Sequence, residues 1–147
     1  MMFFRLILTT LATLLFSPLA LASASPACGD FLAEIARKPP GLGFVDCTKG
    51  DNTQLRSLVA RYRVQGGQAR DIERYLIRHA RMARLHRYCC VWEPSVQGNP
   101  RYGSFSTPSG SHYEVIMESD ETVIRQRAKW REIPWFHVLV TLYLDEP

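Results

Sequence analysis

Hydrophobic and polar residues alternate most regularly over residues 58–65, where the apolar positions are Leu58, Ala60, Tyr62 and Val64. Successive side chains of a strand point to opposite faces, so this pattern predicts a half-exposed antiparallel strand. Residues 43–48 predict a shorter strand, and a hairpin is predicted where residues 101–105 and 111–117 flank a turn. The apolar run over residues 135–144 predicts a final strand buried on both faces.

Three segments have the pattern of helices. Residues 31–37 follow Asp30, which is a favourable N-cap residue. Over residues 68–82, apolar residues recur at helical spacing and arginines line another face. Residues 119–131 begin with acidic and end with basic residues, which suits the helix dipole. With the strands, these helices predict one α+β domain over residues 25–147, an antiparallel sheet with helices packed on one face.

Two of the four cysteines, Cys89 and Cys90, lie in the aromatic and β-branched run 85–93, which predicts a central strand. Neighbours on a strand point to opposite faces, so we expect them to bond to Cys28 and Cys47 rather than to each other. Two connectivities remain open. Either gives two disulfides that close loops of roughly 40 to 60 residues and contribute about 4 kcal/mol each.

The chain begins with a short basic end, an apolar run over residues 6–16 and small residues up to Ala24. This pattern predicts a secretory signal peptide over residues 1–24, with cleavage near Ala22 or Ala24. The apolar run is too short for a membrane anchor. We therefore expect a periplasmic or secreted protein without a transmembrane anchor in its mature form. Acylation of Cys28 in a lipoprotein is the alternative, although the residues before it fit that signal poorly.

The net charge of +4 hides an uneven distribution of charge. Between residues 56 and 87, nine arginines stand against only Asp71 and Glu73; they are Arg56, Arg61, Arg63, Arg70, Arg74, Arg78, Arg81, Arg84 and Arg87. An arginine-rich surface suits an acidic partner. The alternative is a solvated helix face whose charges are balanced across the fold by acidic residues, namely Glu114, Glu118, Asp120 and Glu121.

The sequence contains no recognisable motif for catalysis, and we expect no metal and no cofactor. The four histidines lack the short spacing of zinc ligands; they are His79, His86, His112 and His137. Cys28 with a histidine could act as a nucleophile, but an even number of cysteines in an exported chain favours disulfides. Nucleic acid is disfavoured as a partner because the arginines and tyrosines match no named module and the compartment argues against it.

We therefore expect a non-enzymatic periplasmic protein that binds a macromolecular partner with an acidic surface, such as an immunity-type inhibitor of an envelope-targeted toxin. Arginine and aromatic residues commonly anchor protein interfaces. The candidate partner-binding residues are Arg70, Arg74, Arg78, Arg81, Arg101, Tyr102 and Trp130. The alternatives are a small envelope hydrolase that uses Cys28 or a histidine, and a module that holds an apolar ligand beside Trp92 and Trp135.

Four short motifs resemble a family of small exported bacterial proteins that carries a domain-of-unknown-function label. They are Cys28-Gly29-Asp30-Phe31-Leu32, Tyr62-Arg63-Val64 with Gly66 and Ala69, Cys89-Cys90 before Trp92-Glu93, and Tyr102-Gly103-Ser104-Phe105. The chain departs from the family's pattern at Val91, where a glycine is expected. Since no activity is assigned to that family, the resemblance implies an exported, disulfide-bonded protein and provides no catalytic residues.

Overall fold

The computed structural model describes residues 25–50 and 55–145. The predicted signal peptide, residues 1–24, lies outside the described residues. The elements are, in order, α1 (Phe31–Glu34), β1 (Gly43–Lys49), β2 (Ser57–Gln65), α2 (Ala69–Ala80), β3 (Leu85–Tyr88), β4 (Val91–Val96), β5 (Asn99–Pro100), β6 (Gly103–Ser106), β7 (His112–Ser119), the 3-10 helix η1 (Arg127–Glu132) and β8 (Trp135–Tyr143).

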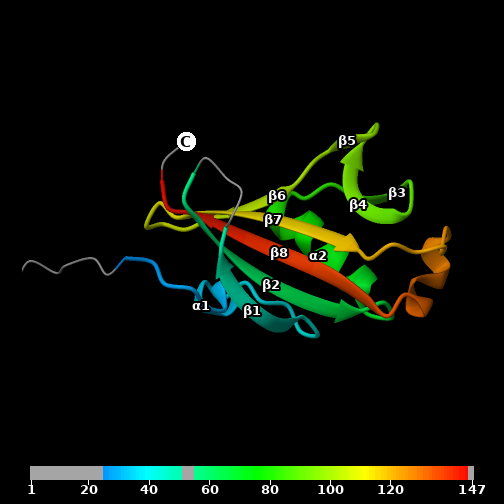
Figure 1. The fold of residues 1–147 in the computed structure, drawn as a ribbon, viewed down its shortest axis with the longest axis horizontal. Helices are drawn as coiled ribbons and strands as arrows, with labels where there is room; N and C mark the ends of the chain where they lie inside the picture. Colours follow the sequence, from blue (N-terminus) through cyan, green and yellow to red (C-terminus); the bar gives the residue numbers. More distant parts are fainter. Residues whose placement is uncertain (1–24, 51–54, 146–147) are drawn as a thin grey trace, which may run out of the picture.

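The main sheet is antiparallel, with the strand order β1-β2-β8-β7-β6 (Figure 1). Both α-helices lie on one face of it. Phe31 of α1 contacts Tyr113 of β7, with ring centroids 5.6 Å apart. On the same face, a Cβ atom on Gly103 of β6 would lie only 2.9 Å from Ala80 of α2, so the missing side chain lets helix and strand approach closely. The predicted α+β architecture is confirmed at this level.

The core lies between this sheet face and α2. The alternation predicted for β2 is confirmed, because its four apolar residues, Leu58, Ala60, Tyr62 and Val64, are at most 5 % exposed. α2 buries Ala69, Ile72 and Leu76, which recur at the spacing of one helix face. No helix of the described residues lies on the other face of the sheet (Figure 1). None of the helices in residues 25–50 and 55–145 is long and apolar enough to cross a membrane.

β8 is the middle strand of the sheet, but the prediction that both its faces are buried is wrong. Its alternate residues Phe136, Val138, Val140 and Leu142 are buried. The residues between them are only half-buried, because they lie on the face that none of the described helices covers. The apolar run of the sequence therefore contains a fully buried face and a partly open one.

The prediction of one central strand over residues 85–93 is also wrong. The run forms the hairpin β3–β4, in which Tyr88 pairs with Val91 and Cys89-Cys90 form a two-residue turn. With β5, this hairpin makes a separate three-stranded sheet beside the main one (Figure 1). Cys89 has a φ of 49°, which a strand does not allow, so the alternation of side chains stops at this point.

The helix predicted over residues 119–131 is replaced by other structure. Ser119 still belongs to β7, irregular chain follows, and only Arg127–Glu132 is helical, as the 3-10 helix η1. Between β7 and η1, the backbone of this segment forms hydrogen bonds to the β3–β4 hairpin. The Thr122 N–H donates to the Cys90 carbonyl at 2.7 Å, and the Trp92 indole N–H donates to the Ile124 carbonyl at 3.0 Å. These tertiary contacts outweigh the charge pattern that favoured a helix.

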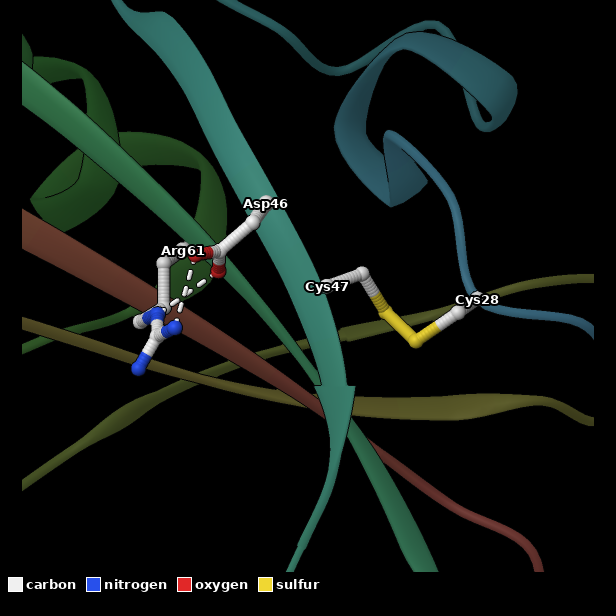
Figure 2. Close-up of a disulfide and its surroundings, with 4 residues drawn as sticks. All are labelled: Cys28, Asp46, Cys47 and Arg61. Carbon is white, nitrogen blue, oxygen red and sulfur yellow. Dashed lines mark hydrogen bonds and ion pairs between the residues drawn. A yellow bond between two sulfur atoms is a disulfide. The ribbon is translucent and has the colours of Figure 1, made fainter.

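One disulfide is present in the described part of the chain, between Cys28 and Cys47, and it joins the segment before α1 to β1 (Figure 2). The prediction that Cys28 and Cys47 bond to Cys89 and Cys90 is therefore wrong. The last two are free thiols in the small sheet. α1 packs beside β1, so residues 19 apart in sequence meet there. The chain order alone did not indicate this proximity.

The buried Tyr62 connects β2 to α1. Its hydroxyl accepts a hydrogen bond from the Leu32 N–H at 3.0 Å, in a region where both residues are inaccessible to solvent. Burial raises the pKa of Tyr62, and the nearby Asp30 carboxylate raises it further. Asp30 also serves as the predicted N-cap, since it accepts from the Ala33 N–H at 3.2 Å. α1 is thus held by polar contacts at its first turn.

Replacing Tyr62 with phenylalanine is expected to lower the free energy of unfolding by about 2 kcal/mol, because the buried Leu32 N–H would lose its acceptor. Urea denaturation followed by tryptophan fluorescence measures this change. The variant Tyr102→Phe is the matched control, since Tyr102 is 44 % exposed. Equal stabilities of the two variants would contradict the role given to the Tyr62 hydroxyl.

An arginine-lined hollow as candidate functional site

Side chains from three parts of the chain line a hollow of about 460 Å³. Arg70, Glu73, Arg74 and Ile77 come from α2, Arg84 precedes β3, and Arg127 belongs to η1. The four α2 residues are spaced i, i+3, i+4 and i+7, which places them on one face of the helix. The hollow therefore gathers four guanidinium groups and one carboxylate.

Glu73 and Arg127 form a fixed ion pair in the hollow. Glu73 is 3 % exposed, and its carboxylate pairs with Arg127 while also accepting from the Leu85 N–H at 2.8 Å. Arg127 donates to the Leu85 carbonyl at 2.9 Å. Its guanidinium carbon lies 4.1 Å from the centre of the Trp130 ring, a distance for cation–π attraction. These contacts neutralise both charges and hold them in place.

The charges of the other three arginines are not neutralised by a strong ion pair with a described residue. Arg74 lies 3.2 Å from Asp71, but both side chains are largely exposed, so the attraction is weak. Arg70 and Arg84 form no ion pair with any residue in the described ranges. Arg61, by contrast, is matched by Asp46 at 2.6 Å, and this hydrogen bond lowers the pKa of Asp46 (Figure 2).

The alternative of a balanced arginine face is not supported by the ion pairs of the described residues. None of the four acidic residues expected to balance α2 pairs with one of its arginines; Glu114 accepts instead from Tyr143 at 3.3 Å, and Asp120 lies 3.1 Å from His137. The hollow is thus a cationic surface with an apolar side chain, Ile77, at its edge. Arginine forks bind carboxylates and phosphates through paired N–H donors, so the hollow can bind an anion.

The structure brings together only some of the predicted partner-binding residues. Arg70 and Arg74 line the hollow, whereas Arg78 and Arg81 are exposed on or after α2 and do not line it. Arg101 and Tyr102 are exposed beyond β5, and Arg101 lines a different hollow. Arg84 and Arg127 were not predicted for this site, because only the tertiary fold brings them next to α2.

Trp130 was a candidate partner-binding residue, but its side chain is buried, with only 1 % exposed. It packs between Trp92 and Phe136, with ring centroids 5.1 and 4.8 Å away. η1 presses this residue against the end of the sheet, and such aromatic packing contributes to the core. The Trp130 ring therefore packs against the Arg127 guanidinium and has almost no surface that a partner could contact.

The cysteine and histidine candidates for catalysis are dispersed. Cys28 is bonded to Cys47 and has no thiolate to act as a nucleophile. His137 lies beside Asp120 on the sheet face without helices, and Glu118 pairs with it across β7 and β8. In residues 25–50 and 55–145, no group of three or more metal-binding side chains is close enough to hold an ion.

Glu118 provides a pH-dependent contribution to stability. Burial raises its pKa above the usual 4.5, and the carboxylates of Glu93 and Asp120 raise it further, while His137 acts in the opposite direction. Between the unfolded and the raised folded pKa, the folded chain binds more protons, so the free energy of unfolding falls as pH rises.

We therefore expect the free energy of unfolding to decrease less with rising pH in Glu118→Gln than in the wild type. The stability of the variant relative to the wild type should increase from the usual pKa of a glutamate upward. Urea denaturation over a series of acidic to neutral buffers measures the difference. Glu121→Gln, at an exposed position, is the control. Parallel stability curves for wild type and Glu118→Gln would contradict the effect.

Comparison with known proteins adds a family and no activity. Residues 20–92 match the model of a family described as a domain of unknown function (DUF4952), which confirms the resemblance to an uncharacterised family. No curated protein and no solved structure matches the chain. The matched range includes α1, β1, β2, α2 and β3, and with them Arg70, Arg74 and Arg84 of the hollow.

Proposed function

We propose that this chain, whose residues 20–92 match the model of a family of unknown function, is an exported, non-enzymatic protein. We propose further that it binds an acidic macromolecule through the arginine-lined hollow. The observation that carries the proposal is that Arg70 and Arg84 have no ion-pair partner among the described residues, beside an Arg127 that is already fixed by Glu73. Guanidinium groups that have no ion-pair partner and lie beside the fixed Glu73–Arg127 pair are suited to bind an external carboxylate.

A protein partner fits the hollow better than a small metabolite. The hollow is open to solvent, and the exposed Arg74 and Ile77 of α2 line it. Small-molecule sites are usually enclosed and lined mostly by apolar side chains, whereas five of the six residues that line this hollow are charged. Charged side chains at such a rim steer an oppositely charged protein and fix its orientation. The proposed partner is an acidic protein that this chain inhibits, such as a toxin that reaches the cell envelope.

The disulfide supports the proposed location outside the cytoplasm. Disulfides such as Cys28–Cys47 form and persist in oxidising compartments and are rare in the cytosol. The basic and apolar start of the sequence suits export as well. Expression of the full chain with an epitope at its C-terminus, followed by cell fractionation, tests the location, and a full-length product retained in the cytoplasm would contradict it.

The binding proposal is tested by reversing the charge of the free arginines. The triple variant Arg70→Glu/Arg74→Glu/Arg84→Glu is compared with wild type in titrations with poly-L-glutamate, an acidic probe of defined chemistry, at low and moderate salt. We expect wild-type binding that weakens as salt rises and a loss of about tenfold or more in the variant. Pull-downs from periplasmic extract with both proteins then identify natural partners.

The matched control is the triple variant Arg125→Glu/Lys129→Glu/Arg131→Glu, which changes the charge equally at exposed positions outside the hollow. We expect it to retain most of the binding. If both triple variants lost binding to the same extent, net charge and not the hollow would explain the interaction. If neither lost it, the hollow would have no role in binding.

A further inference from the structure

The two free cysteines form a pair at the tip of the β3–β4 hairpin. Their sulfur atoms are 3.0 Å apart, and the Cys89 side chain is exposed while Cys90 is partly so. Cys89 and Cys90 alone occupy the turn between the paired residues Tyr88 and Val91. In a strand these side chains would point apart, but the turn directs both to the same side.

The backbone of the turn is held in an unusual conformation. Cys89 has a φ of 49°, in the left-handed region that residues other than glycine rarely adopt. Such conformations are energetically unfavourable for residues other than glycine and often mark a functional site. Nothing in the sequence of the turn relieves this cost, since no glycine or asparagine occupies it.

The hairpin tip is anchored to the segment that follows β7. The Thr122 N–H donates to the Cys90 carbonyl at 2.7 Å, and the Arg87 guanidinium donates to the Thr122 carbonyl at 2.8 Å. Nearby, the Trp92 N–H donates to the Ser119 hydroxyl at 2.9 Å. Thr122 is therefore directly bonded to the backbone of the turn, so a change of backbone geometry at Cys90 would alter the hydrogen bond of its N–H.

We propose that Cys89 and Cys90 are a redox-active vicinal dithiol that closes to a disulfide by exchange with an external disulfide. Closure requires the sulfur atoms to approach by about 1 Å from their present separation. The fixed hairpin keeps the second thiol at high effective concentration, so ring closure is favoured over attachment of a second external thiol.

The exchange proceeds in two balanced steps. The Cys89 thiolate, the more exposed of the two, attacks one sulfur of a small disulfide; a mixed disulfide forms and one thiolate of the reagent leaves. Cys90 then loses its proton to solvent and attacks the Cys89 sulfur, which releases the second thiolate. The two cysteines lose two electrons, and the small disulfide gains them to become two thiols. The hydrogen bond with Cys89 raises the pKa of Cys90, which favours Cys89 as the first nucleophile.

Peptide mapping of the purified protein tests the proposal. The protein is exposed to oxidised glutathione, free thiols are alkylated, and trypsin releases residues 88–101 as one peptide with both cysteines. We expect this peptide to be unalkylated and lighter than its reduced form by two hydrogen atoms. A stable glutathione adduct on Cys89, a disulfide between two chains, or exchange with Cys28 or Cys47 would each overturn the proposal.

A second readout uses the reduced protein and phenylarsine oxide, a reagent that bridges two neighbouring thiols. We expect one equivalent to bind, to resist an excess of a monothiol and to be removed by a dithiol. Cys89→Ser and Cys90→Ser should each weaken binding by about 100-fold or more, because the second arsenic–sulfur bond is then lost. Each variant should instead form a mixed disulfide with glutathione. Equal binding by wild type and the single variants would overturn the proposal.

The transmitted change is measured by NMR. We expect the Thr122 amide signal to shift between the oxidised and reduced wild type, because its acceptor is the Cys90 carbonyl. In the double variant Cys89→Ser/Cys90→Ser the signal should not respond to oxidised glutathione. An unchanged Thr122 signal in wild-type protein whose ring has closed would contradict the coupling between the turn and this segment.

Discussion

Replacing Arg127 with methionine is expected to lower the free energy of unfolding by about 3–5 kcal/mol, the largest loss among the substitutions considered. Glu73 would remain 3 % exposed but would lose the guanidinium that neutralises it. A buried charge without its partner costs far more than the pair contributes to stability. Urea denaturation at neutral pH, followed by tryptophan fluorescence and by circular dichroism, measures the loss.

Two further variants separate this cause from others. In Arg127→Met/Glu73→Leu both charges are absent, and most of the stability should return, because buried ion pairs are commonly replaceable by apolar residues of similar volume. Arg125→Met, at an exposed position, should change stability by about 0.5 kcal/mol or less. If the double variant were as unstable as Arg127→Met, packing against Trp130 and not the ion pair would account for the loss.

The same pair explains why the hollow was only partly predictable from the sequence. The helical spacing of Arg70 and Arg74 is local information, and it correctly placed them on one face of α2. Arg127 is 54 residues from Glu73 in sequence, and their contact depends on where η1 meets the sheet. No local pattern could indicate it, although an acidic residue at a buried helical position is a signal that a distant cation is needed.

Sequence patterns predicted the secondary structure correctly where an element buries one of its faces. They failed where two elements compete for the same backbone hydrogen-bonding groups. β2 and α2 each have one apolar face, and their periods of two and 3.6 residues are visible in the sequence. The segment after Ser119 has helical charge placement, but Thr122 and Ile124 bond to the β3–β4 hairpin. The structure of this segment therefore depends on the β3–β4 hairpin, for which the sequence pattern predicted a single strand.

The cysteines show the same dependence. In a single strand over residues 85–93, Cys89 and Cys90 would point to opposite faces. For this reason the sequence analysis predicted that they bond to Cys28 and Cys47 and not to each other. The turn at Cys89 places the two sulfurs 3.0 Å apart instead, and Cys28 bonds to Cys47. The number of cysteines was informative about the compartment, but their pairing depended on the location of one turn.

Removing the Cys28–Cys47 disulfide is expected to lower the free energy of unfolding by about 3 kcal/mol, less than the 4 kcal/mol expected of the longer loops first predicted. The bonded residues are only 19 apart, so the crosslink restricts the unfolded chain over a shorter loop.

The variant Cys28→Ser/Cys47→Ser, compared with wild type by urea denaturation without reductant, measures this loss. The control is Cys89→Ser/Cys90→Ser, which keeps the Cys28–Cys47 bond and should retain most of the stability under the same conditions. Because α1 is also held by Tyr62 and by the pairing of Asp30 with Lys38 at 2.5 Å, we expect the variant without the bond to remain folded. A variant as stable as wild type would mean that these contacts already constrain the segment before α1, and that the disulfide adds no restriction of its own.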